Sequence, residues 1–298
     1  MVKKIFFYLD WLYRCKVKNE RIPLSAALVI TDLCNLHCSH CSVAHLGYEK
    51  QSYKDVISTL ENIYQKGIRI IILTGGEPFL WSDAEHQLND VIAFAKKKGF
   101  FRVLMCTNGT FPLESKADSL WVSLDGSSAE HDSIRGSVYD KILDNIQSSS
   151  HKQIYINYTV STLNCHNLEA SVNAMLRIKG IKGVFFHLFI PYVGADASLA
   201  LKDGQRENVV KTLFRLKKKH PFKIVNTFDA LKCLLRNSWE RPLWSSITIS
   251  QGEENICCCR KGLHDEETCK QCGGGPATES FVLQAVKPLA ILENLRFL

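Results

Sequence analysis

The stretch Ala26-Ala-Leu-Val-Ile-Thr31-Asp-Leu-Cys34-Asn-Leu-His-Cys38-Ser-His-Cys41 joins an apolar run to three cysteines with the spacing C-x3-C-x2-C. The apolar run predicts a strand, and a loop that follows a strand can bring three thiols around one inorganic centre. Thiolates favour iron–sulfur clusters, zinc or copper(I). A cubane cluster usually takes four thiolates, so three leave one iron with an open position. Open positions are typical of reactive metal centres, and closed ones of structural sites.

Beyond Pro23, apolar runs of strand length alternate with segments of helix length. We expect strands at 26–31, 69–74, 101–107, 120–124, 153–161 and 183–190, and helices at 52–66, 83–98, 138–149, 167–179 and 203–219. This alternation predicts an α/β fold built from parallel βαβ units. Periodicity alone allows a barrel and a doubly wound sheet equally. The pattern weakens after about Phe222, where we place a domain boundary.

Four more motifs follow the cysteines in order: Thr74-Gly75-Gly76-Glu77-Pro78, Thr107-Asn108-Gly109, Ser123-Leu-Asp125-Gly126 and His131-Asp-Ser-Ile-Arg135-Gly136. The first three end expected strands, where parallel α/β folds place their active sites. Over about residues 20–200 this series resembles the radical S-adenosylmethionine (SAM) enzymes. The resemblance implies a partial (β/α)6 barrel with a small cysteine-rich C-terminal appendage.

The resemblance also implies a reaction. Cys34, Cys38 and Cys41 would hold three irons of a [4Fe-4S] cluster, and SAM would chelate the fourth iron. One electron, from a reductant such as a flavodoxin or ferredoxin, would then cleave SAM into methionine and a 5′-deoxyadenosyl radical that modifies a substrate. The cofactor carries the difficult step and the protein supplies positioning. On this interpretation the chain is a radical SAM enzyme of the oxidoreductase or transferase type.

The glycine-rich motif is the expected SAM-binding segment. Gly75 and Gly76 would let the backbone approach SAM closely, since a Cβ atom there would obstruct it. Glu77 would accept a charge-assisted hydrogen bond from the SAM ammonium group. Without the cysteines, the same residues would be read as an ordinary turn between a strand and a helix.

Other polar residues follow the strand ends. Asn108, Ser123 and Asp125 suit the ribose hydroxyls or the SAM carboxylate, although capping and turn hydrogen bonds also explain such residues. Arg135 can pair bidentately with the SAM carboxylate, and a surface salt bridge is the alternative. His40 is a departure, because many members of the family carry an aromatic residue just before the third cysteine. An imidazole can still pack against an adenine ring.

A second group of cysteines lies near the C-terminus, at Cys257-Cys258-Cys259 and Cys269-Lys-Gln-Cys272, followed by three glycines. Side chains alternate in an extended segment, so Cys257 and Cys259 can point together and form a closed four-thiolate site with Cys269 and Cys272. This resembles a shortened auxiliary-cluster appendage (SPASM or twitch) of radical SAM enzymes. A second [4Fe-4S] cluster and a structural zinc ion use the same ligands, and both remain open.

Composition limits the remaining classes. The 298 residues are 46% hydrophobic, enough for a full core, and the net charge of +7 is moderate. The lysine runs 96–98 and 217–219 end expected helices, where they complement the helix dipole, so we expect solvated faces and no nucleic-acid partner. Eight of the twelve cysteines fall in the two groups, which favours metal binding in a reducing cytosol. Finding no membrane span and no signal peptide, we expect a cytoplasmic protein.

Residues 3–18 predict an amphipathic helix whose apolar face carries Ile5, Tyr8, Leu9, Leu12 and Tyr13. Such a helix can lie in a membrane interface or dock on the domain, and the sequence does not separate these alternatives. The expected organisation is therefore an N-terminal helix (1–20), a radical SAM core (21–221) and a C-terminal region with the second cysteine group and a terminal helix (222–298).

Three hypotheses for function remain. The first is an enzyme that modifies a peptide, and the second is one that acts on an isoprenoid or lipid. The layout of the chain is similar to the adenosyl-hopene-forming radical SAM enzymes, and the apolar run 185–189 fits that weakly. His187 and Tyr192, at the last expected strand end, can face the substrate, although a role in the core or at the rim is favoured for both. The third hypothesis is a scaffold or binding protein, stapled by zinc or an iron–sulfur cluster, that does not cleave SAM.

Overall fold

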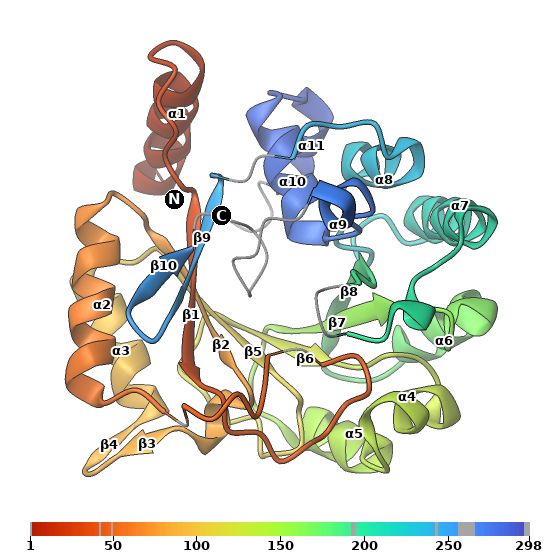
Figure 1. Cartoon of the computed structure of the whole chain (residues 1–298), viewed down its shortest axis with the longest axis horizontal. Helices are drawn as coiled ribbons and strands as arrows, with labels where there is room; N and C mark the ends of the chain where they lie inside the picture. Colours follow the sequence, from red (N-terminus) through yellow and green to blue (C-terminus); the bar gives the residue numbers. More distant parts are fainter. Residues whose placement is uncertain are drawn as a thin grey trace.

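The computed structural model describes residues 2–41, 43–48, 50–191, 195–241, 244–255 and 266–294. Its centre is a run of parallel strands: β1 (Ser25–Thr31), β2 (Ile70–Gly75), β5 (Arg102–Thr107), β6 (Ser119–Ser123), β7 (Ile154–Val160) and β8 (Ile181–Leu188). They lie side by side in chain order, without the reversal of order that marks a doubly wound sheet. The predicted partial (β/α)6 barrel is confirmed, with the helices along its outside (Figure 1).

Two further strands extend the sheet beyond β1. β9 (Ser246–Ser250) pairs in parallel with β1, and β10 (Glu253–Asn255) pairs antiparallel with β9, giving an eight-stranded sheet in the described part of the chain. The sequence did not predict either strand, because both are short and β10 is entirely polar. The sheet therefore crosses the proposed boundary at 221, and the three-part division of the chain stays a prediction.

The longer helices follow the predicted order. The structure has α2 (Tyr53–Gln65), α3 (Leu88–Lys98), α4 (Ser128–Arg135), α5 (Tyr139–Ser148), α6 (Leu168–Met175), α7 (Asp203–Lys219), α8 (Phe228–Arg236), α9 (Glu266–Lys270), α10 (Gly275–Gln284) and α11 (Pro288–Asn294). The predicted helix 83–98 begins only at Leu88. The residues before it form a small hairpin of β3 (Ser82–Asp83) and β4 (His86–Gln87), with Ala84 at a φ of 48°.

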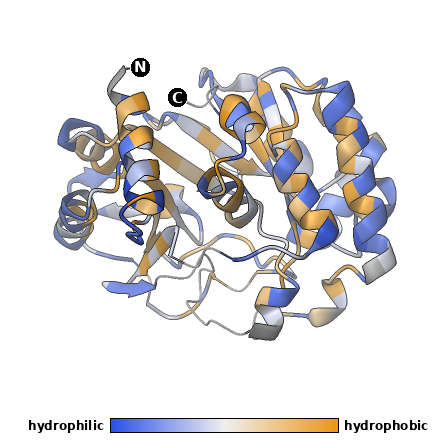
Figure 2. Cartoon of the chain, turned by 90° about the horizontal axis from the view of Figure 1, so that it is seen from above, coloured by the Kyte–Doolittle hydropathy of each residue, from blue (hydrophilic) through white to orange (hydrophobic). Residues whose placement is uncertain are grey.

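Alternation along the strands separates two faces of the sheet. On β6, Leu120 and Val122 are fully buried in the main core, while Trp121 and Ser123 are only partly buried on the opposite, inner face. Strand side chains alternate with a period of two, so the outer face packs against helices and the inner face lines the barrel. Figure 2 shows hydrophobic residues concentrated on the strands and mixed colouring on the helices around them.

The N-terminal helix α1 (Val2–Lys16) docks at the amino ends of the strands. Trp11 and Cys15 are buried against Leu24, with Ile70 at the start of β2 partly buried beside them. The Trp11 indole N–H donates to the Ile22 carbonyl at 2.9 Å. Helix α1 thus lies at the opposite end of the sheet from the cysteine loop (Figure 1). No helix among the described residues is both long and apolar enough to cross a membrane.

Two partly buried glutamates tie the C-terminal helices to the core. Glu279 accepts from the Thr227 amide at 2.8 Å, and Glu293 accepts from the Phe228 amide at 3.1 Å, so both lie at the start of α8. Glu293 also pairs with Lys217 at 2.7 Å. Lys217 is fully buried, so the predicted solvated face is wrong for this lysine: its ammonium is compensated by a carboxylate and by carbonyls such as that of Pro221.

Candidate active site

The cysteine loop follows β1 and is held from two sides. Gly76 donates its amide to the Thr31 carbonyl at 2.8 Å, and Glu77 donates its amide to the Leu33 carbonyl at 2.8 Å. On the other side, the Ser39 amide donates to the carbonyl of Ile134 in α4 at 2.9 Å. These backbone bonds fix the loop at the carboxyl edge of the sheet, where the sequence predicted the site.

The two glycines are needed for this packing. A Cβ atom on Gly75 would lie 2.1 Å from the Thr31 carbonyl oxygen, and one on Gly76 would lie 2.2 Å from that of Leu33. Real Cβ atoms do not approach backbone so closely, and Gly75 also has a φ of +153°. The sequence predicted glycine for contact with SAM; the structure supplies a different reason, the seating of the cysteine loop.

Glu77 connects the glycine motif to the end of β5. Its carboxylate accepts from the Asn108 amide at 2.6 Å, the Thr107 hydroxyl at 2.8 Å and the Phe79 amide at 3.1 Å. Burial raises the pKa of Glu77 to about 7, against the lowering effect of these hydrogen bonds. A cation beside this carboxylate would offset the cost of burying its charge. The predicted contact with the SAM ammonium stays a prediction.

Asn108 reaches the first cysteine directly. Its amide nitrogen donates to the Cys34 sulfur at 3.7 Å and to the Asn35 side-chain oxygen at 2.9 Å. Its own oxygen accepts from the Thr110 amide and hydroxyl, at 2.9 and 2.7 Å, which fixes the orientation of the amide. Asn108 therefore holds the cysteine loop. Ser123 lies elsewhere, on the inner face of the barrel.

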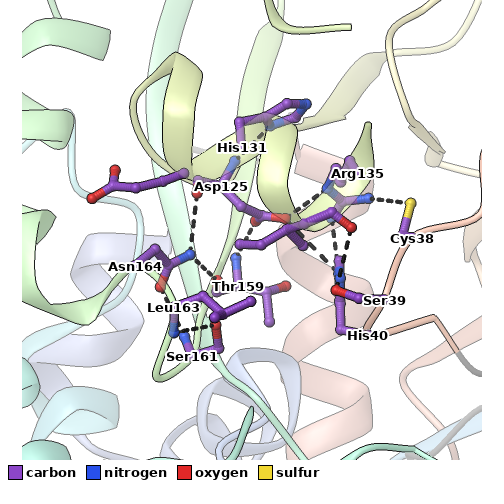
Figure 3. Close-up of polar contacts among 12 residues, drawn as sticks. Cys38, Ser39, His40, Asp125, His131, Arg135, Thr159, Ser161, Leu163 and Asn164 are labelled. Atoms are coloured by element: carbon purple, nitrogen blue, oxygen red, sulfur yellow. Dashed lines mark hydrogen bonds and ion pairs between the residues drawn. The ribbon is translucent and has the colours of Figure 1, made fainter. Parts of the chain in front are cut away.

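A compact ionic network joins Asp125 to the second cysteine (Figure 3). The guanidinium of Arg135 donates from Nε to Asp125 at 2.6 Å, from Nη1 to the Cys38 sulfur at 3.8 Å and from Nη2 to His40 Nε2 at 3.2 Å. The second oxygen of Asp125 accepts from the Thr159 amide at 2.7 Å. The alternative of a surface salt bridge for Arg135 is wrong, because the Asp125 side chain is fully buried and that of Arg135 is 11% exposed.

The residues of this network set one another's ionisation states. Burial alone would raise the pKa of Asp125, but Arg135 and His40 outweigh it and the pKa is lowered. Burial alone would lower the pKa of Arg135, but Asp125 raises it. Burial, aided by Arg135, lowers the pKa of His40 to about 4. His40 is therefore neutral near pH 7, and since its Nε2 accepts from Arg135 its proton sits on Nδ1.

Burial and neighbouring charges shift the pKa of two thiols of the cysteine loop. Burial raises the pKa of both Cys34 and Cys38, Arg135 partly opposes this at Cys38, and the neighbouring Cys41 raises both. The negative charges of neighbouring thiolates repel one another, and this repulsion favours the protonated thiols. A positively charged metal centre, together with the N–H groups that donate to the sulfurs, would favour the thiolate form instead. Among the described residues, no group of three His, Cys, Asp or Glu side chains is arranged to hold a metal ion.

Comparison with known families agrees with this geometry. Residues 28–168 match the model of the radical SAM superfamily. These residues form a radical SAM domain. Members of this superfamily are enzymes, and the motifs from Cys34 to Gly136 all lie within the matched residues.

Two curated relatives and one solved structure indicate the range of the superfamily. The chain is 28% identical to the pre-heme d1 synthase of Dinoroseobacter shibae over 64% of its own length and 50% of that protein. It is 26% identical to the AdoMet-dependent heme synthase of Methanosarcina barkeri over 69% and 62% of the two lengths. The chain thus spans about half to three fifths of these relatives. Streptococcus suis SuiB shares the fold, with a TM-score of 0.66 at 16% identity, covering 96% of this chain and 70% of SuiB.

The radical SAM network contains residues that the sequence analysis missed. Asn164 is fully buried and donates to the Asp125 carbonyl at 3.1 Å and to the Thr159 carbonyl at 2.9 Å (Figure 3). His131, which opens the fourth motif quoted from the sequence but had no role assigned, accepts from the Asp125 amide at 3.1 Å, and burial lowers its pKa to about 4, as it does that of His40. Asn164 follows β7 closely, so the rule of polar residues after strand ends would have identified it.

The inner face of the radical SAM barrel carries aromatic and polar side chains. Trp121 stacks on Tyr155 with ring centroids 4.9 Å apart and meets Phe185 edge-on at 5.6 Å. Nearer the carboxyl edge, His187 lies 3.4 Å from the Asn157 side-chain oxygen. His187 therefore lies on the predicted inner face, whereas Tyr192, the other candidate to face the substrate, lies outside the described residues.

The second cysteine group is described only in part. Cys269 and Cys272 share one turn, in which the Cys272 amide donates to the Cys269 carbonyl at 3.1 Å and the Gly274 amide donates to the Cys272 sulfur at 3.4 Å. The Arg241 guanidinium donates to the Cys269 carbonyl at 2.9 Å. Cys257, Cys258 and Cys259 lie outside the described residues, so the four-thiolate site stays a prediction.

The triple glycine packs this turn against the barrel. A Cβ atom on Gly273 would lie 2.3 Å from the Leu188 Cβ, and one on Gly275 would lie 2.7 Å from the Phe186 carbonyl oxygen. The Leu188 amide donates to the Gly273 carbonyl at 2.9 Å. The Cys269–Cys272 turn is thereby fixed near the carboxyl end of β8, at the same edge of the sheet as the cysteine loop.

Proposed function

We propose that the chain reductively cleaves SAM at a [4Fe-4S] cluster held by Cys34, Cys38 and Cys41, and that the 5′-deoxyadenosyl radical so formed modifies a substrate. The observation that carries this proposal is the seating of three thiols on one loop at the carboxyl edge, with N–H donors on two of the sulfurs. The match to the radical SAM superfamily supports the same chemistry. A flavodoxin or ferredoxin would supply the electron.

The residues of the chain would orient SAM and hold the cluster. When bound, the cluster supplies one electron to the sulfonium, which breaks the S–C5′ bond. Glu77 would accept the SAM ammonium, since a carboxylate offers about four acceptor positions and three donors from the chain already use it. That cation would also lower the raised pKa of Glu77. Ser123, on the inner face, would bond the ribose or the SAM carboxylate.

The inner face indicates what part of the substrate enters the barrel. The aromatic cluster of Trp121, Tyr155 and Phe185 would pack against an apolar or aromatic group. Asn157 and His187 above it would bond one polar function of that group. A hydrophobic side chain of a peptide and an isoprenoid unit both meet this description. Incubation with each class, followed by mass spectrometry of the product, separates the two.

A SAM-cleavage assay tests the central proposal. The wild type, Cys38→Ala and, as a control, Cys165→Ala would be reconstituted with iron and sulfide without oxygen, reduced, and analysed for 5′-deoxyadenosine. Cys165 is a free, partly buried thiol away from the loop. We expect cleavage by the wild type and the control and none by Cys38→Ala. A colourless, iron-free wild type, or full cleavage by Cys38→Ala, would overturn the proposal.

We further propose that Cys257, Cys259, Cys269 and Cys272 form a second metal site. The Cys269–Cys272 turn supports this, because an amide already donates to the Cys272 sulfur, as thiolate ligands require. Replacing Cys269 and Cys272 together should lower metal content while SAM cleavage persists. Iron analysis decides the metal: about eight irons indicate two cubanes, and about four irons with one zinc indicate a structural zinc site. Unchanged metal content in the double variant would remove the site.

We also propose that α1 contacts a membrane surface peripherally. Phe6, Leu9 and Tyr13 on α1 and Val17 just beyond its end are 66%, 55%, 51% and 68% exposed, although the opposite side of the helix is docked. Basic residues accompany these side chains, with none of the first-turn residues acidic and Arg14 and Lys16 in the last turn. Exposed apolar side chains flanked by cations complement an anionic lipid surface.

A further inference from the structure

Arg135 occupies the junction of α4, the end of β6 and the cysteine loop (Figure 3). Each of its three guanidinium nitrogens has a partner: Asp125 at 2.6 Å, the Cys38 sulfur at 3.8 Å and His40 at 3.2 Å. A planar guanidinium group with a hydrogen-bond partner on each of its three nitrogens is fixed in one orientation. In that orientation one N–H is directed at a thiol that the radical SAM motif assigns to the cluster.

The position of Arg135 is strongly constrained by its carboxylate. Asp125 is fully buried, and the Thr159 amide holds its second oxygen at 2.7 Å. Asn164 holds the backbone carbonyl of Asp125 at 3.1 Å. Swinging Arg135 away to a SAM carboxylate would break a buried ion pair and leave the Asp125 charge uncompensated, which is strongly unfavourable in a protein interior.

We propose that Arg135 is a positioning residue that raises the reduction potential of the cluster through its charge and its hydrogen bond to the Cys38 sulfur. This rests on the proposed function, since it requires a cluster on the cysteine loop. Reduction adds one negative charge to a cluster, and hydrogen bonds to its sulfurs favour that state. In a buried site the effect is larger than in water. The predicted role of Arg135 as a partner of the SAM carboxylate is replaced by this one.

Two neighbours give the proposal an internal comparison. Asn108 donates to the Cys34 sulfur at 3.7 Å, as Arg135 does to Cys38, but it carries no charge. Asp125 carries the opposite charge and lies beside the same guanidinium. If electrostatics set the reduction potential, removing the charge of Arg135 should lower it and neutralising Asp125 should raise it. Removing the Asn108 amide should also lower the reduction potential, but by less than removing Arg135.

A redox titration followed by electron paramagnetic resonance tests the inference without using activity. The reconstituted wild type would be compared with Arg135→Gln, Asp125→Asn and Asn108→Ala, with Arg215→Gln as control, since Arg215 forms an exposed ion pair with Glu169 far from the loop. We expect the midpoint of Arg135→Gln to fall by the equivalent of at least tenfold in the reduction equilibrium, about 59 mV for one electron. We expect that of Asp125→Asn to rise and that of the control to stay unchanged.

The outcomes separate this inference from the proposed function. A wild type that assembles no cluster would overturn both. A wild type that assembles a cluster and cleaves SAM, with an unchanged midpoint in Arg135→Gln or with a fall in both Arg135→Gln and Asp125→Asn, would overturn the inference alone. Should Arg135→Gln fail to retain iron, Arg135→Lys decides the matter. It keeps the charge but loses the guanidinium group that directs an N–H at the Cys38 sulfur, so its midpoint should lie below that of the wild type, and an unchanged midpoint would overturn the inference.

Discussion

Gly76 shows how a single residue sets the geometry of the site. Its missing side chain lets the glycine motif lie against the carbonyls of Asp32 and Leu33, and its amide bonds Thr31. The cysteine loop is therefore seated by backbone contacts before any ligand is considered. Glu77, the next residue, then bonds the loop after β5 through its carboxylate. Consecutive residues of one motif thus join three loops at the carboxyl edge of the sheet.

Gly76→Ala should destabilise the protein and reduce its iron content. The added Cβ would lie 2.2 Å from the Leu33 carbonyl oxygen, so backbone must move, and overpacking of this kind typically costs about 1–3 kcal/mol. The matched control is Gly204→Ala, where a Cβ meets nothing within 4 Å near the start of α7. Urea unfolding would measure both. Equal stability of the two variants would show that the glycine motif is not under steric constraint.

Glu77→Gln should weaken SAM binding to the reconstituted protein. The amide keeps the size of the side chain but loses the charge that would pair with the SAM ammonium, a loss typically worth about 1.5–3 kcal/mol, or about tenfold to a hundredfold in Kd. Equilibrium dialysis would measure Kd, with Glu85→Gln as control because Glu85 is exposed on the small hairpin. An unchanged Kd for Glu77→Gln would remove Glu77 from the SAM site.

Site residues could be predicted from the sequence where a reactive or polar side chain also falls at the end of an expected strand. Cysteine spacing and strand ends located Cys34, Asn108 and Asp125 at one edge of the sheet. Their partners could not be predicted, because contacts such as Arg135 with Cys38 span 97 residues and depend on how α4 packs. The carboxylate of Asp125 was assigned to SAM, whereas in the structure it is committed to Arg135 and the Thr159 amide.

Whole elements were predictable when their pattern was long. The six barrel strands and α7 were found near their observed bounds, since apolar runs and capping residues mark them clearly. Short or polar elements were missed: β10 has three polar residues, and α4 has only eight residues. The hairpin at 82–87 was read as the start of α3, because its residues fit a helical pattern and its turn at Ala84 carries no glycine.

The contact between α8 and α10 should make stability depend on pH. Burial raises the pKa of Glu279 to about 7, against the lowering effect of the Thr227 amide. A carboxyl whose folded pKa lies above its unfolded value stabilises the fold least when ionised, so stability should fall as pH rises from about 4.5 to about 7. The expected loss of stability is on the order of 3 kcal/mol.

Glu279→Gln would remove this loss. We expect the variant to match the wild type near pH 5 and to exceed it in free energy of unfolding near pH 8, as measured by urea denaturation at both pH values. Glu77 has the same raised pKa, so the variant should reduce the pH dependence without abolishing it. Glu207→Gln, at an exposed site on α7, is the control. Parallel pH profiles for wild type and Glu279→Gln would contradict the burial argument.

At the scale of the whole molecule, two surfaces lie at opposite ends of one sheet. The loops with the cysteines occupy the carboxyl ends of the strands, and α1 covers the amino ends (Figure 1). The sequence left open whether α1 docks on the domain or lies in a membrane interface. The structure shows docking through Trp11 and Cys15, and it leaves Phe6, Leu9, Tyr13 and Val17 exposed, which the proposed lipid contact would use.

Vesicle binding tests this surface. We expect the protein to sediment with vesicles of phosphatidylcholine and phosphatidylglycerol and less with phosphatidylcholine alone. Leu9→Asp should weaken binding about tenfold or more, as expected for a buried leucine worth about 1.5–3 kcal/mol. Phe222→Asp is the control, since Phe222 is 81% exposed on a different part of the surface. Absence of vesicle binding, or a change of oligomeric state in Leu9→Asp, would instead assign these side chains to a protein contact.

The most direct test of the central claim is the electron paramagnetic resonance spectrum of the reduced, reconstituted protein with and without SAM. Three thiolates on one loop predict a [4Fe-4S] signal whose shape changes when SAM is added, because the ligand occupies the iron that Cys34, Cys38 and Cys41 leave open. The part of the signal that SAM changes should be lost in the triple variant of these cysteines. A cluster signal that SAM leaves unchanged, or no cluster at all, would contradict the account.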